Sequence, residues 1–382
     1  MVDTPTPDTD AIDAYFALCL RTRLDGSHLP PWDVRLNGDL ARRRAAFQGI
    51  ALVLASEEGL PDDWPEEVEL AIREEARLQA LWEPSHRNAV ADAIEALHTA
   101  EIEALAMKGT ALAYSVYSDP AIRRRGDTDL LVETTDRKRV RSALEGAGFA
   151  LREKLVLQEA WSRKSRDGFV HEIDLHWRIN ASPAVSGAWE ADHPRSRSRP
   201  LPSLSPSARG LSPTDSFIQT CINRRAHRGF GYLVGEEKIE GGDRLIWALD
   251  LHLLAQDFEA SDWRQLIETA NVVGAGEIVA SGMNFAQRSL ATDFPDEVRN
   301  ALAHSGRMSD YFAAPSTAQR LAMDVAASRS MSAIAALLSG HLFPPRSFFT
   351  ERDPGAARGS LAWLRARRLL DAGVRMLLGR RR

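Results

Sequence analysis

Apolar and polar positions follow two different periods along the chain. Up to residue 100, apolar residues recur at the spacing of an amphipathic helix. This pattern predicts helices at 11–20, 38–58, 64–81 and 87–100. Pro65 suits the first turn of the third helix, and the two glutamates after it suit the positive end of a helix. We therefore expect a helical N-terminal lobe over residues 1–100, with a polar and disordered lead-in at 1–9.

A mixture of short strands and helices is predicted over residues 101–180. The strands are expected at 102–108, 127–133, 149–158 and 169–177, and the helices at 111–117 and 136–146. Asp167-Gly168 is a strong hairpin signal between the last two strands. The order lacks regular βαβ crossovers, so a doubly wound sheet is not expected. The predicted fold class is α+β, with a small mixed sheet between two helical lobes.

The segment 181–213 is rich in proline, arginine and serine, which predicts a loop. Its part 195–209 carries four arginines, and we favour a disordered connector over a flap that closes on an anionic substrate. Helical patterns resume at 214–225 and 243–257 and define a C-terminal lobe over 214–382. The basic stretch 361–382 is interpreted as a packed terminal helix, with contact to an anionic membrane or an acidic partner as the alternative.

Composition narrows the class of protein. The 382 residues have a net charge of -5, so we expect no long nucleic acid as a partner. The only cysteines, Cys19 and Cys221, are too far apart in sequence to suggest a zinc motif or a disulfide framework. The polar start of the sequence is unlike a signal peptide, and no apolar run of about 18 residues predicts a transmembrane helix. A reducing cytosol fits these features.

Three aspartates form the main candidate site. Asp127 and Asp129 are two apart on a predicted strand, so both carboxylates point to one side of it. On the strand at 169–177, Asp174 shares a face with Glu172 and His176, while Ile173, Leu175 and Trp177 lie on the opposite face. If the two strands are neighbours, the three carboxylates can hold two magnesium ions about 3.5–4 Å apart, an arrangement that suits in-line phosphoryl displacement. Manganese is an alternative ion.

Cationic and glycine residues nearby are candidates for binding a nucleotide. Lys108, Gly109 and Thr110 lie between a strand and a helix, where glycine permits close approach of the backbone to a phosphate. Of the arginines just before Asp127, we select Arg123 and Arg125 to neutralise a triphosphate. His176 either lines the site or is a half-buried histidine with a local hydrogen bond. His171, on the opposite face, is expected to be structural.

The stretch KGTALAYSVYSDPAIRRRGDTDLLV, followed by EIDLHWRI, resembles a family of bacterial uncharacterised nucleotidyltransferases in the polymerase-β superfamily. That superfamily has a small-residue turn opening a helix, then Asp-x-Asp on a strand, then a third Asp on a later strand. Gly109-Thr110, Asp127, Asp129 and Asp174 match this order. The resemblance covers about 104–178, with a weaker echo at 211–254.

The resemblance implies a polymerase-β-like core and a magnesium-dependent enzyme. Such an enzyme moves a nucleoside monophosphate from a nucleoside triphosphate, with ATP favoured, to an acceptor and releases pyrophosphate. The resemblance does not imply a particular acceptor, which is either a small molecule or a protein or peptide partner. A module that binds nucleotide without turnover is the remaining alternative.

Overall fold

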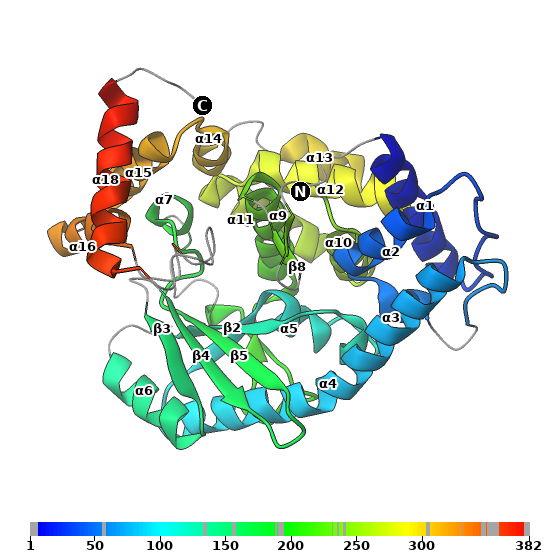
Figure 1. Ribbon diagram of the computed structural model, residues 1–382, viewed down its shortest axis with the longest axis horizontal. Coiled ribbons are helices and arrows are strands. Elements are labelled where there is room, and N and C mark those ends of the chain that lie inside the picture. The colour runs from blue at the N-terminus through cyan, green and yellow to red at the C-terminus, as the bar shows by residue number, and fades with distance from the viewer. Residues whose placement is uncertain are drawn as a thin grey trace.

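A mixed seven-stranded sheet, with helices on both faces, lies at the centre of the computed structural model (Figure 1). The structure describes residues 7–55, 59–132, 136–154, 158–187, 189, 195–230, 232–234, 237–239, 242–302, 306–328, 330–344, 349 and 359–377. The first residues of the predicted lead-in, 1–6, lie outside the described part, whereas the rest of it already belongs to the first helix.

The main sheet has seven strands in the order β3-β4-β5-β2-β1-β7-β6. These strands are β1 (Ala104–Met107), β2 (Asp127–Val132), β3 (Ala150–Lys154), β4 (Gln158–Lys164), β5 (Val170–His176), β6 (Arg199–Pro200) and β7 (Arg209–Gly210). Two neighbouring pairs are parallel, β2 with β5 and β1 with β7, and the other pairs are antiparallel. A separate hairpin joins β8 (Tyr232–Val234) and β9 (Glu237–Ile239). The mixed sheet confirms the predicted α+β class.

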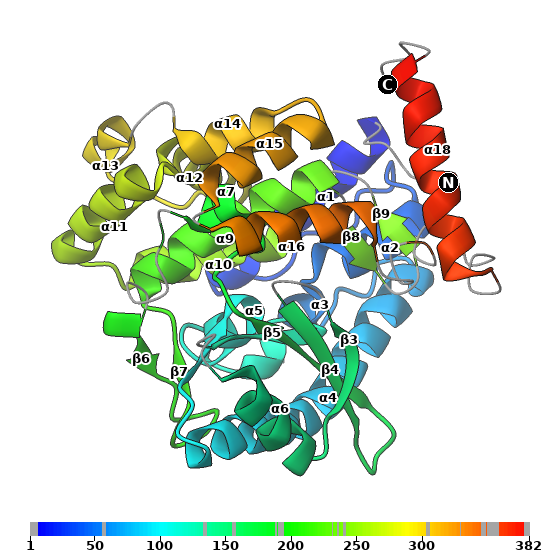
Figure 2. The same cartoon turned by 90° about the vertical axis from the view of Figure 1, so that its left-hand side faces the viewer.

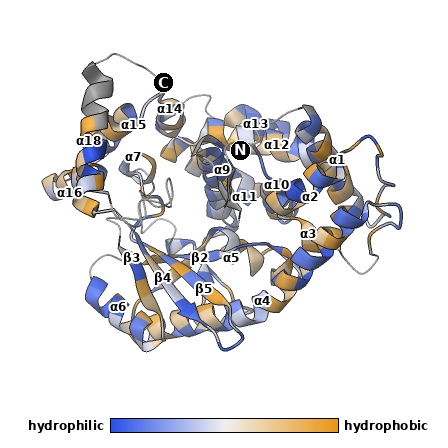
Figure 3. Cartoon of the chain, viewed as in Figure 1, coloured by the Kyte–Doolittle hydropathy of each residue, from blue (hydrophilic) through white to orange (hydrophobic). Residues whose placement is uncertain are grey.

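One face of the sheet is covered by α4 (Glu66–Thr99) and α6 (Arg137–Gly146), which lie below it in Figures 1 and 2. Along α4, hydrophilic and hydrophobic residues intermix, as expected for a helix that buries one face (Figure 3). The buried face of α4 includes Val90, Ile94 and Leu97, which pack in one cluster with Leu130 and Val132 of β2. The central strand is therefore anchored from below by a long helix.

The opposite face of the sheet meets helices from both ends of the chain. Besides α4 and α6, the described helices are α1 (Pro7–Leu24), α2 (Gly38–Gln48), α3 (Ala51–Leu54), α5 (Lys108–Ala113), the 3-10 turn η1 (Pro120–Ile122), α7 (Pro183–Ser186), α9 (Pro213–Phe230), α10 (Leu245–Gln256), α11 (Ala260–Val273), α12 (Gly276–Leu290), α13 (Asp296–Ala301), α14 (Arg307–Ala313), α15 (Thr317–Ala327), α16 (Met331–Leu342) and α18 (Leu361–Leu377). Leu105, Met107 and Leu131 of the sheet share one core with residues of α1, α9, α10 and α12. The N- and C-terminal helices thus pack together, and the exact lobe boundaries stay a prediction.

Two helix predictions need correction. The expected helix 38–58 is divided into α2 and α3, because Gly49 ends α2 in the left-handed conformation with φ 72°. The expected helices 64–81 and 87–100 are one helix of 34 residues that contains Pro84. Proline removes one backbone donor and is disfavoured in a helix interior, yet Pro84 lies within α4. Its buried neighbours Glu83 and His86 have polar partners on other elements, which hold this part of α4 in place.

One strand prediction and one loop prediction also change. The expected strand 149–158 is β3 followed by the start of β4, and β4 is the strand that forms the Asp167-Gly168 hairpin with β5. The expected loop 181–213 contains α7, β6 and β7. Because Leu201 and Leu204 are buried at 2% exposure each, the disordered connector proposed for 195–209 is wrong.

The last helix, α18, packs against the end of α16. Arg365 donates from Nε to the backbone oxygen of Pro344 at 2.9 Å, but Trp363 and Leu370 are exposed, so the packed-helix interpretation stays a prediction. Among the described residues, no helix combines the length and the apolar character needed to cross a bilayer. Membrane-surface contact by this helix stays a prediction.

Candidate active site

The site is built by the parallel pairing of β2 and β5. In this register Asp129 lies opposite Asp174, and Asp127 lies opposite Glu172. Side chains of directly paired residues lie on the same face of a sheet. Ile173, Leu175 and Trp177 are buried on the other side, so the predicted division of β5 into a polar and an apolar face is confirmed. Neighbouring strands therefore bring Asp129 and Asp174 together.

Asp129 is the most enclosed of the three carboxylates, at 4% exposure. Its Oδ1 atom accepts from Lys108 Nζ at 2.5 Å and contacts His176 Nε2 at 2.7 Å. Burial alone would raise the pKa of Asp129, but the Lys108 charge and the His176 hydrogen bond hold it well below its usual range. The other ring nitrogen, His176 Nδ1, is buried without a hydrogen-bond partner among the described residues.

The other two carboxylates have no ion-pair partner within the part of the chain that the structure describes. Loss of hydration, then the charge of Asp129, raises the pKa of Asp127 to about 7, even though solvent reaches this residue at the start of β2. The same two causes raise the pKa of Asp174. A divalent cation would stabilise both charged forms and reverse these shifts.

Three side chains at the site could act as ligands of such a cation. Asp129, Asp174 and His176 each offer a ligand atom within 4.8 Å of the others, and Asp127 lies outside this group of three. Carboxylate oxygens suit magnesium and manganese. Two under-neutralised carboxylates beside a third fit a divalent ion, provided that the Lys108 ammonium moves off Asp129.

The turn at residues 108–110 differs from its prediction. Lys108 is already the first residue of α5, and Gly109 lies inside the helix. A Cβ atom at position 109 would lie 3.3 Å from Cβ of Arg125, so glycine allows close packing here. The Thr110 hydroxyl is 2.9 Å from the Thr128 hydroxyl and is buried. These contacts direct Thr110 away from the carboxylates.

Arg123 and Arg125 lie apart from the carboxylates, in buried ion pairs. Arg123 makes two bonds to Asp250 of α10, at 2.7 and 2.8 Å, and Arg125 contacts Glu83 of α4 at 2.6 Å. Both guanidinium groups are thereby committed to other elements, and we do not assign them to a nucleotide.

Comparison with known proteins shows which family the chain belongs to. A family described as uncharacterised nucleotidyltransferases matches residues 39–291, well over half of the chain. The chain belongs to this nucleotidyltransferase family. No curated protein matches the chain. The family match extends beyond the resemblance seen in 104–178, and it includes α4 on one side of the sheet and α12 on the other.

In this nucleotidyltransferase, a buried polar chain lies beneath the carboxylates, on the α4 side of the sheet. His86 Nε2 is 2.9 Å from the Thr128 hydroxyl, His86 Nδ1 is 3.3 Å from His171 Nδ1, and His171 Nε2 is 3.0 Å from the Ser85 hydroxyl. The Trp82 ring stacks on His86 at 3.9 Å between centroids. His171 is structural, as predicted, whereas His86 was missed because a lone histidine in a helix carries no local signal.

The histidine chain predicts that the nucleotidyltransferase loses stability in mild acid. Burial, then the charges of Arg125 and His171, lowers the pKa of His86 well below its ordinary value of 6.5, and burial also lowers the pKa of His171. Below about pH 6.5 the unfolded chain therefore binds more protons than the folded chain, so the free energy of unfolding falls as pH falls. Urea unfolding at pH 7.5 and pH 5.5 measures this loss.

The variant His86→Asn is expected to be less stable than wild type at pH 7.5, but its free energy of unfolding should change less with pH. Equal pH slopes for wild type and His86→Asn would contradict the prediction.

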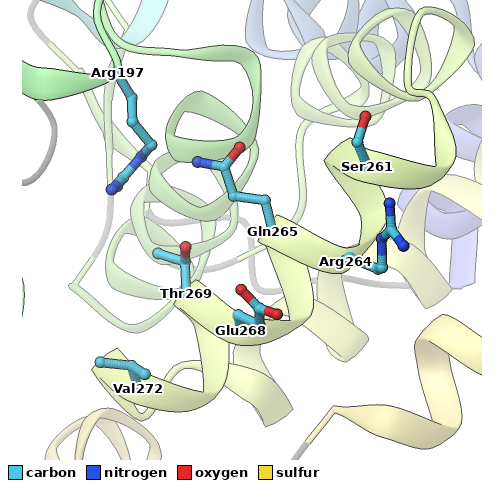
Figure 4. A pocket seen from close by; sticks show the side chains of 7 residues that line it. All are labelled: Arg197, Ser261, Arg264, Gln265, Glu268, Thr269 and Val272. Carbon is cyan, nitrogen blue, oxygen red and sulfur yellow. The ribbon is translucent and has the colours of Figure 1, made fainter.

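A cavity of about 670 Å³ lies elsewhere on the nucleotidyltransferase. Six of its seven lining side chains come from α11, and Arg197 faces Gln265 and Thr269 across it (Figure 4). Arg197 also makes a two-bond ion pair with Asp215, at 2.6 and 3.0 Å. This cavity contains none of the predicted site residues, so it is separate from the carboxylate site.

Proposed function

We propose that the chain transfers a nucleoside monophosphate from a nucleoside triphosphate to a hydroxyl or phosphate acceptor and releases pyrophosphate. One observation carries the proposal: the parallel register of β2 and β5 sets Asp129 beside Asp174 at the polar face of the sheet. Family membership supports transfer of a nucleotidyl group. The order of turn, Asp-x-Asp strand and later Asp strand supports a polymerase-β-like core.

Asp127, Asp129 and Asp174 would hold the metal ions, two magnesium ions in our proposal, with manganese fitting the same ligands. When bound, these ions supply charge neutralisation for the triphosphate and lower the pKa of the attacking group. The acceptor oxygen forms a bond to the α-phosphorus as the bond from that phosphorus to the bridging oxygen breaks. Asp174 accepts the acceptor's proton, and Lys108, released from Asp129, neutralises phosphate charge.

The first test of this function is nucleotide binding by the full chain. Thermal stability would be measured with ATP, GTP, CTP and UTP, each with and without magnesium. A ligand at about a hundred times its dissociation constant stabilises the folded state by roughly 2.7 kcal/mol, which a melting curve detects. We expect a magnesium-dependent shift with ATP that is lost in Asp127→Ala/Asp129→Ala.

The matched control is Asp167→Asn, which changes a carboxylate in the β4–β5 turn, at the far end of β5 from Asp174. This variant should keep the wild-type shift. A shift that survives the double substitution would overturn the assignment of the site. Binding without pyrophosphate release across small-molecule and peptide acceptors would favour the non-catalytic alternative.

A protein or peptide acceptor is the second candidate function within the same chemistry. Mass spectrometry of co-purified partners tests it, because transfer adds the mass of one nucleoside monophosphate to the acceptor. Unmodified partners together with modified small molecules would exclude it.

A further inference from the structure

The first residue of α5 has an unusual backbone. Lys108 has φ 50°, in the left-handed region that side-chain-bearing residues seldom occupy. For a residue with a Cβ atom this conformation costs roughly 1–2 kcal/mol. Something in the fold must therefore hold Lys108 in this turn.

Gln219 of α9 supplies that hold. Its Oε1 atom accepts the Lys108 backbone N–H at 2.9 Å, and its Nε2 atom donates to Met107 Sδ at 3.3 Å. Gln219 is only 5% exposed. Because the oxygen and the nitrogen of the Gln219 amide both have a partner, the orientation of the amide is fixed. The position of the Lys108 N–H is fixed with it. A helix more than a hundred residues away in sequence thus sets the Lys108 turn.

The turn directs the Lys108 ammonium onto Asp129, at 2.5 Å from Oδ1. The same oxygen is also held by His176, at 2.7 Å. A cation that coordinates this oxygen must therefore displace one of the two donors. The Lys108 side chain is 30% exposed and the Asp129 side chain 5%, so the lysine is the donor that has room to leave.

We propose that Gln219 is a positioning residue that holds Lys108 as the internal counter-ion of Asp129, and that divalent cation binding displaces this ammonium. The inference rests on the proposed function of the carboxylate site. Lys108 keeps the buried Asp129 charge compensated before metal binds, and repulsion between ammonium and metal moves it away afterwards. Metal affinity is thereby lowered by the cost of breaking the Lys108–Asp129 pair.

The experiment measures the dissociation constant of Mn²⁺ alone for the full chain, by electron paramagnetic resonance of the free ion. Lys108→Met removes the ammonium and keeps the backbone bond to Gln219. Gln219→Met keeps the ammonium and removes the hold on the turn. Both variants should bind Mn²⁺ more tightly than wild type, on the order of tenfold for Lys108→Met, because a hydrogen bond to a charged group contributes about that much. Gln219→Met should show a smaller gain of the same sign.

Gln48→Met is the matched control. Gln48 is 1% exposed, and its Oε1 atom accepts the backbone N–H of Leu245 at 2.6 Å. It therefore resembles Gln219 in burial and bonding but lies between α2 and α10. Gln48→Met should lose stability while keeping the wild-type Mn²⁺ affinity. If Gln219→Met does not fold, Gln219→Asn, which shortens the side chain, takes its place.

The outcomes separate the two proposals. Unchanged or weaker Mn²⁺ binding by Lys108→Met would overturn the displacement, and an unchanged affinity in the folded Gln219 variant would overturn the positioning role. Absence of Mn²⁺ binding in every variant and in wild type would instead overturn the proposed function of the site.

Discussion

Asp129→Ala and Asp127→Ala should each lower the rate of pyrophosphate release by at least about 10²–10³-fold, the size of loss seen when one charge-stabilising group is removed from an active site. Asp129 is the carboxylate at which Lys108 and His176 converge, and it is paired in register with Asp174. Its loss would remove one of the proposed metal ligands. The measurement is pyrophosphate release with the donor identified by thermal shift.

Each variant must first be shown to be folded, by circular dichroism and by its melting temperature. Asp127 is at the exposed start of β2, so Asp127→Ala should leave the fold intact. Asp167→Asn serves again as a carboxylate control with an unchanged rate. Wild-type turnover by either site variant would refute the assignment of these carboxylates.

The grouping of the carboxylates could be predicted because it depends only on the alternation of side chains along each strand. On a strand, residues two apart share a face, so the sequences of β2 and β5 alone group Asp127 with Asp129 and Asp174 with His176. The adjacency of the two strands was assumed, and the parallel register confirms it. The contact of His176 with Asp129 is compatible with both interpretations of this histidine, as a residue that lines the site and as a histidine with a local hydrogen bond.

The partners of the cations could not be predicted, because they are distant in sequence. Arg125 is paired with Glu83, 42 residues earlier, and the backbone of Lys108 is held by Gln219, 111 residues later. Position near Asp127 suggested that the arginines would neutralise phosphate. Buried carboxylates on α4 and α10 compete for the same guanidinium groups, and only the tertiary structure shows them.

Hidden polar residues also explain the strands that the pattern missed. Glu159 of β4 is fully buried and makes an ion pair with Arg141. Because glutamate is usually exposed, the sequence of β4 does not show that this position belongs to the core. In the segment predicted as a loop, Ser198 and Ser205 are buried at 4% and 5% exposure. The strands β6 and β7 have two residues each, too short for a periodic pattern.

Asp250→Ala should lower the free energy of unfolding by about 3–5 kcal/mol, the usual cost of removing one partner of a buried ion pair. Asp250 is fully buried, and its side chain accepts two bonds from Arg123 and one from the Tyr117 hydroxyl at 2.7 Å. The substitution leaves the Arg123 guanidinium, in a side chain that is 8% exposed, without its counter-charge. Urea unfolding at pH 7.5 gives the free-energy difference.

Two further variants show that the loss comes from an uncompensated charge. Arg123→Met/Asp250→Leu removes both charges and should recover most of the stability, because a buried ion pair replaced by apolar side chains of similar volume is often neutral or stabilising. Glu69→Ala breaks the exposed pair with Arg73, whose side chains are 32% and 54% exposed, and should cost under about 1 kcal/mol. If the double variant were as unstable as Asp250→Ala, lost packing rather than charge would explain the effect. The Arg123 and Asp250 side chains would then hold the segment before β2 against α10 by packing and not by charge.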